Sequence, residues 1–152
     1  MLNRRDTLGH AAKVAGLMAT AGLWPHLAHA AFEAKAFEAK TMTELMAALS
    51  GGAPAQSGDI TITGPDIAEN GAVVPLGAST ALPGVKRMLL LVEKNPSVLA
   101  AMFDVTPAVE ANFSTRVKMG QSSNVYAVAM MNDGKVLFAQ KEVKVTLGGC
   151  GG

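Results

Sequence analysis

The sequence predicts an all-β fold, an antiparallel β-sandwich, over residues 59–147. In this region short apolar or alternating segments recur, with a turn about every eight to twelve residues, as is typical of sandwiches. The tripeptide Asn132-Asp133-Gly134 is a strong hairpin signal between two of these segments. A helical pattern is confined to the residues before Ser50. The sequence therefore predicts a short N-terminal helix, a β-sandwich and a C-terminal extension.

The expected strands follow one another along residues 59–147 with different burial patterns. Between residues 59 and 63 isoleucine alternates with threonine, which predicts one buried face. Pro75 lacks a backbone N–H, so it is expected at an edge or a bulge. Both alternating sets of residues 125–131 are apolar, which predicts burial on both faces. The other expected strands are 73–80, 85–92, 98–105, a short strand at 115–119, and 136–147.

Residues 31–58 are expected to form a helical segment followed by a linker. Residues 31–40 repeat Ala-Phe-Glu-Ala-Lys in tandem, and they are either a docking segment or a loosely ordered leader. Thr43 is the expected N-cap of a helix over 44–49, and residues 50–58 read as a Gly/Ala/Pro/Ser linker. The buried face of this helix would consist of Leu45, Met46 and Leu49.

Residues 1–30 have the pattern of a twin-arginine export signal. Arg4-Arg5 precede an uncharged stretch over 14–23, and Ala28-His29-Ala30 supplies the small residues that a signal peptidase requires. The apolar stretch is too short to span a bilayer. We therefore expect cleavage before Ala31, export to the periplasm by the twin-arginine route, and no membrane association.

The composition after this cleavage site excludes several functions. All three histidines precede residue 31, and the chain has a single cysteine. A hydrolase with a histidine base and a zinc site built from His and Cys are therefore excluded. The remaining residues carry a net charge of −1, without the basic stripe that nucleic-acid binding requires. No catalytic residues, metal site or cofactor are expected.

Cys150 is the candidate functional residue. It lies within residues 148–152, between Gly148, Gly149, Gly151 and Gly152. Residues without a Cβ adopt many backbone conformations, so this segment is expected to be a flexible arm. From Leu147 the arm reaches about 10 Å, at ~3.3–3.6 Å per residue. We therefore expect Cys150 to attach substrate covalently, in a carrier protein that is not itself an enzyme.

Three other interpretations of this terminus remain open. Gly151-Gly152 also suits a ubiquitin-like sulfur carrier that is thiocarboxylated on its terminal carboxylate. Periplasmic export opposes this interpretation, because the activation consumes ATP. A structural protein dimerised by a Cys150 disulfide is the second alternative. An incidental thiol on a disordered tail is the third.

The sequence resembles the SoxY family, the sulfur-carrier subunits of the bacterial thiosulfate-oxidising (Sox) system. The resemblance rests on the terminal Gly-Gly-Cys-Gly-Gly, the segment 65–71 (Pro-Asp-Ile-Ala-Glu-Asn-Gly) followed by Val74-Pro75, Lys94-Asn95-Pro96, and Lys144-Val145-Thr146. It implies an immunoglobulin-like fold and thiosulfate-derived intermediates on Cys150. The tandem repeat at 31–40 is not a family feature that we can place.

The resemblance also implies several partners. These are a SoxZ subunit in a heterodimer or heterotetramer, a haem-containing enzyme that couples thiosulfate to the thiol, a manganese-dependent hydrolase that releases sulfate, and in some systems a sulfur dehydrogenase.

Two roles are open for the residues Asp66, Glu69, Asn70 and Gly71. They are expected either to orient the arm and meet the partner subunit, or simply to form a tight turn in which φ is positive. Lys144 and Arg116 either attract anionic intermediates or are merely solvated.

Overall fold

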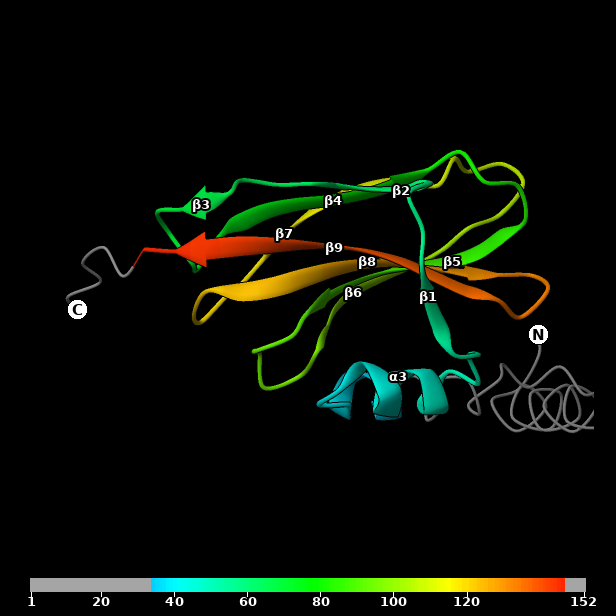
Figure 1. Cartoon of the computed structure of the whole chain (residues 1–152), viewed down its shortest axis with the longest axis horizontal. Coiled ribbons are helices and arrows are strands. Elements are labelled where there is room, and N and C mark those ends of the chain that lie inside the picture. Colours follow the sequence, from blue (N-terminus) through cyan, green and yellow to red (C-terminus); the bar gives the residue numbers. More distant parts are fainter. Residues whose placement is uncertain (1–33, 147–152) are drawn as a thin grey trace, which may run out of the picture. The chain divides into compact units, whose positions relative to one another are not determined.

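The computed structural model describes residues 34–146, and these residues form the predicted β-sandwich (Figure 1). Within this range the larger sheet has the strand order β1-β9-β8-β5-β6, with β3 also paired to β9, and the smaller sheet has the order β2-β4-β7. The larger sheet contains β1 (Pro54–Gln56), β3 (Ile67–Ala68), β5 (Val85–Val92), β6 (Leu99–Asp104), β8 (Ser123–Met131) and β9 (Val136–Val145). The smaller sheet contains β2 (Ile60–Thr63), β4 (Val74–Thr80) and β7 (Asn112–Val117).

The strand pairing is that of an immunoglobulin-like sandwich. Strands β5, β8 and β9 form the antiparallel centre of one sheet, and β2, β4 and β7 form the other. Near the N-terminal end of the sandwich, β1 runs parallel to the start of β9. The chain then crosses to the smaller sheet as β2 and returns to β9 as β3, again in parallel. The predicted fold class is therefore confirmed.

The larger sheet is buried on both faces. Its inner face packs against the smaller sheet through Met88, Leu90, Val125 and Ala127, which are fully buried. Its outer face carries Leu89, Leu91 and Val128 in a second cluster together with the N-terminal helical residues. This second cluster explains why both alternating sets of β8 are apolar, as the sequence analysis expected.

The helix α3 (Met42–Ala48) supplies the cover for the outer face (Figure 1). Leu45, Met46 and Leu49 are buried against the sheet, as predicted. Residues 34–38 are also helical, and Ala36 and Ala39 are buried in the same cluster. The backbone continues this contact, because Val98 N–H donates to Ala39 O at 3.0 Å. The second copy of the tandem repeat is therefore a docking segment.

The predicted N-cap of this helix is wrong. Thr41 caps it, because the backbone N–H of Glu44 donates to Thr41 Oγ1 at 3.1 Å. The Glu44 carboxylate in turn accepts a hydrogen bond from the backbone N–H of Lys40 at 2.9 Å. A threonine followed three residues later by a glutamate is the capping-box pattern, and Thr41 and Glu44 have that spacing whereas Thr43 does not.

The expected linker at 50–58 is also partly wrong, because it contains β1. These residues have little intrinsic strand preference, and they are extended because they pair with β9 from Pro54–Val136 to Gln56–Phe138. Pro75 was expected at an edge or a bulge, whereas it lies in β4, the middle strand of the smaller sheet. The pairing of β2 with β4 stops at Gly77, so Pro75 faces no strand on that side of β4 and its missing N–H costs no ladder hydrogen bond.

The predicted hairpin between β8 and β9 is confirmed. Gly134 has a φ of 87°, a left-handed conformation that favours glycine. Met131 N–H donates to Lys135 O at 2.9 Å and thereby closes the loop. This hairpin fixes the register of β9, the strand that leads to the C-terminal residues.

Candidate functional site

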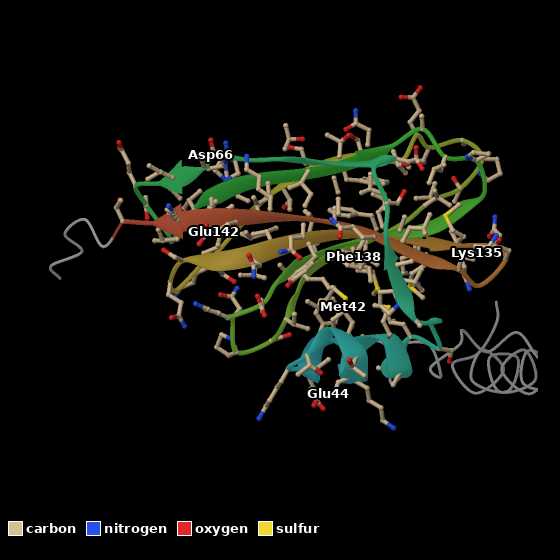
Figure 2. The ribbon with its side chains drawn as sticks, viewed as in Figure 1. Met42, Glu44, Asp66, Lys135, Phe138 and Glu142 are labelled. Atoms are coloured by element: carbon tan, nitrogen blue, oxygen red, sulfur yellow. The ribbon has the colours of Figure 1, made fainter. Side chains whose placement is uncertain are left out.

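The predicted arm itself, Gly148, Gly149, Cys150, Gly151 and Gly152, lies outside the described residues, as do the export signal and its histidines. The described structure instead shows the root from which the predicted arm continues, at the end of β9. Figure 2 shows Asp66 and Glu142 near this end of β9 and Lys135 near the opposite end.

The last described residues of β9 extend beyond its pairing with β8. That pairing ends at Ser123–Val143. Beyond it, β3 holds one edge of β9, because Lys144 N–H donates to Asp66 O at 2.9 Å and Thr146 N–H donates to Ala68 O at 3.0 Å. On the other edge Val145 N–H donates to Ser122 Oγ at 2.8 Å. The chain is thus held on one edge up to Thr146 and on the other up to Val145.

Lys141 ties the segment before β3 to β9. Its Nζ donates to the carbonyl oxygen of Gly64 at 2.6 Å and lies 2.9 Å from the carboxylate of Asp66. Lys141 lies on the same face of β9 as Ala139 and Val143, because side chains two residues apart point to the same side of a strand. Ala139 and Val143 pack into the core between the sheets. Its ammonium group is therefore at the open edge of the sandwich, where an inward-pointing charge also discourages pairing with other chains.

The turn at Asn70 and Gly71 differs from the prediction. Asn70 Oδ1 accepts a hydrogen bond from Ala72 N–H at 2.9 Å, so the asparagine does organise a turn. Gly71, however, does not have a positive φ. A Cβ at this position would lie 2.4 Å from Met119 O and 2.8 Å from Val145 Cγ1. Glycine is needed here for close approach to the end of β9.

The remaining predicted residues lie on the surface near this root. Glu69 is exposed just after β3, and Lys144 is exposed on β9. Arg116 is exposed on β7, opposite Pro75 in the strand register. The apolar side chains of Ile67 and Val73 are 57% and 50% exposed, respectively. The surface around the root is therefore mixed, with cationic, anionic and apolar groups.

Among the described residues, the side chains whose pKa values are shifted lie away from this root. Burial raises the pKa of Tyr126, and the nearby Glu93 carboxylate adds to the effect. In the β8–β9 hairpin, hydrogen bonding to Lys135 lowers the pKa of Asp133. Within residues 34–146 no group of three or more His, Cys, Asp or Glu side chains has the geometry of a metal site. Across this same range no helix has the length and hydrophobicity to cross a bilayer.

Together these features define a class of protein. It is an all-β sandwich whose last strand is held on both edges up to Val145, just before the glycine-rich segment that contains Cys150. Residues 46–150 match the family of the sulfur oxidation protein SoxY, so the match includes Cys150. The chain belongs to the SoxY family.

A solved structure agrees with this assignment. The sulfur carrier protein SoxY from Chlorobium limicola f thiosulfatophilum is 34% identical, with a TM-score of 0.62 over 69% of this chain and 94% of that chain. Superoxide reductase (neelaredoxin) from Ignicoccus hospitalis is 20% identical, with a TM-score of 0.51 over 57% of this chain and 80% of that chain, and it shares the fold alone. No curated protein matches the sequence. The chain is thus a member of a sulfur-oxidation carrier family that works within the Sox system.

Ser122, Lys141 and β3 are parts of this root that were not predicted from the sequence. The sequence carried a signal for Lys141, because this charged residue stands between Ala139 and Val143 among the residues of the strand that face the core. Strand β3 is too short to show a period, and Ser122 gave no signal, because a hydroxyl near a strand end has many possible roles.

Proposed function

We propose that this protein is a periplasmic, covalent carrier of thiosulfate-derived sulfur, with the intermediates attached to Cys150. The observation that carries the proposal is the position of Cys150, only four residues beyond a strand end that is held on both edges. A fixed root with a short glycine-rich continuation suits a thiol that must enter the active sites of other proteins. The family match, which extends to residue 150, supports the same function.

The chemistry that we propose needs nothing from this chain except the thiol. Oxidative coupling of thiosulfate converts Cys-SH and S₂O₃²⁻ into Cys-S-S-SO₃⁻, and releases one proton and two electrons to a haem-containing partner. Hydrolysis by a manganese-dependent partner then consumes one water, releases sulfate and two protons, and leaves Cys-S-S⁻ on the carrier. Where a sulfur dehydrogenase is present, it oxidises the remaining sulfane sulfur.

Several further features belong to the same proposal. The chain travels to the periplasm by the twin-arginine route and pairs with a SoxZ subunit. It provides no catalytic group of its own, so each partner activates the bound sulfur in its own pocket. Gly148, Gly149, Gly151 and Gly152 let the backbone follow Cys150 into a narrow channel, because glycine has no side chain.

The test is a Cys150→Ser variant in a reconstituted Sox system, with thiosulfate-dependent cytochrome reduction as the measurement. A Gly120→Ala variant is the matched control, because a Cβ there would meet no atom within 4 Å. We expect loss of electron transfer and of any disulfide-linked dimer in Cys150→Ser, and neither loss in the control. If Cys150→Ser loses only the dimer, Cys150 is a structural crosslink and the proposal is wrong.

A further inference from the structure

We infer that residues 64–72 act as a clamp that sets where β9 ends, and hence the point from which the chain continues towards Cys150. In this assignment Lys141, Ser122 and Gly71 are positioning residues for Cys150. The inference rests on the proposed carrier function, because the clamp matters only if Cys150 must be presented at a defined reach. It gives the segment 65–71, one of the motifs that carried the family resemblance, a physical role.

Residues 144–146 depend on this clamp for their order. Their neighbours in the sheet are not β8, whose pairing ends at Ser123–Val143. Their backbone N–H groups instead donate to Asp66 O, Ser122 Oγ and Ala68 O, at 2.9, 2.8 and 3.0 Å. Two of the three acceptors therefore belong to the clamp, and the third is a single hydroxyl on the opposite edge.

The clamp is itself anchored at both ends. Lys141 Nζ holds its start, through Gly64 O at 2.6 Å and the Asp66 carboxylate at 2.9 Å. Gly71 holds its end, because Gly71 O accepts a hydrogen bond from Met119 N–H at 2.7 Å. Met119 is 2% exposed, so this second anchor is part of the core between the sheets. The Asp66 side chain is 87% exposed, and its ion pair is the weakest part of the arrangement.

The clamp determines how far Cys150 can reach from the sandwich. From Thr146 to Cys150 the extended chain spans about 13–14 Å, at ~3.3–3.6 Å per residue. If the clamp opens, the last held residue becomes Val143 and the same calculation gives about 23–25 Å. A longer tether lowers the effective concentration of the thiol near the end of β9, by about twofold for a flexible chain. It also removes the fixed direction in which the chain leaves the sandwich.

Hydrogen exchange of the backbone amides of residues 144–146 tests the clamp directly. The variants are Lys141→Met and Ser122→Ala, each in the full chain. The control is Lys135→Met, which breaks an ion pair of 2.8 Å to Asp133 near the other end of β9. In Lys141→Met we expect the Lys144 and Thr146 amides to exchange at least about fivefold faster, since one hydrogen bond contributes about that factor.

The set of amides whose exchange becomes faster distinguishes a clamp from independent local contacts. Lys141 donates to neither residue 144 nor residue 146, so their faster exchange would report opening of the whole segment. Ser122 bonds Val145 from the opposite edge and is not an anchor of residues 64–72, so in Ser122→Ala the clamp predicts faster exchange at Val145 while residues 144 and 146 stay protected. Unchanged exchange at residues 144 and 146 in Lys141→Met would overturn the inference.

A distance measurement tests the effect on Cys150 itself. Because the chain has a single cysteine, a Ser114→Cys substitution on exposed β7 gives one defined pair of spin labels with Cys150. We expect Lys141→Met to extend the distance distribution by up to about 10 Å. Lys141→Arg keeps the positive charge, so its distribution should match that of the natural protein. An identical distribution in Lys141→Met would contradict the clamp. Neither measurement involves sulfur chemistry, so this inference can fail while the carrier function stands, and the reverse.

Discussion

Replacing Gly71 by alanine tests whether close packing, rather than backbone conformation, explains this glycine. The new Cβ would lie 2.4 Å from Met119 O and 2.8 Å from Val145 Cγ1. Ordinary carbon contacts are ~3.5–4.0 Å, so the turn must move by about 1 Å. Such overpacking costs about 1–3 kcal/mol, and the movement weakens the hydrogen bond from Met119 N–H to Gly71 O, which contributes about 1 kcal/mol.

The expected loss of about 2–4 kcal/mol lowers Tm by about 8–16 °C, at about 4 °C per kcal/mol for a domain of this size. Thermal unfolding followed by circular dichroism measures this shift. Gly120→Ala is the matched control: its Cβ meets no atom within 4 Å and its φ is not positive. We expect the control to stay within about 0.5 kcal/mol of the natural protein or to stabilise it slightly. Equal stability of the two variants would refute the steric reasoning.

Three other predictions follow from the described residues. Leu45→Ala, at a fully buried position under α3, should cost about 2–5 kcal/mol in urea unfolding, and a loss below about 1 kcal/mol would show that the helix is not part of the core. Thr41→Ala should cost about 1 kcal/mol in the same assay while Thr43→Ala costs less, and the reverse order would contradict the observed cap. Absorbance titration of Tyr126, the sole tyrosine, should give a midpoint above its ordinary value of 10.0, and Glu93→Gln should lower that midpoint. Because folding raises the pKa of Tyr126, its neutral phenol contributes to the free energy of unfolding at pH values below the ordinary pKa, and this contribution is lost as the pH rises through the raised pKa of the folded protein. A midpoint at or below 10.0 would refute this reasoning.

The sequence predicted the elements whose patterns are local. Strand β8 is apolar on both alternating sets because it is buried between the smaller sheet and the helical cover, and both sets were visible in the sequence. The hairpin at Asn132-Asp133-Gly134 was equally predictable, because Gly134 needs a positive φ that few other residues adopt. Pro75 was predictable only in part, because it lies in the middle strand β4 at a point where β2 no longer pairs with it.

The features that the sequence did not reveal depend on contacts between distant segments. Strand β1 lies in a stretch of weak strand preference and is extended only because β9 runs beside it. Gly71 looked like a turn glycine, whereas its requirement comes from Met119 and Val145, far away in the chain. The root of the candidate site was hidden for the same reason, since Lys141 meets Gly64 across 77 residues.

The intact mass of the protein from cells grown on thiosulfate, with peptide mapping before and after reductant, tests the central claim most directly. The account predicts sulfur-containing additions on Cys150 that a reductant removes. A thiocarboxylate on Gly152 instead, or an unmodified Cys150 while the cells consume thiosulfate, would contradict it.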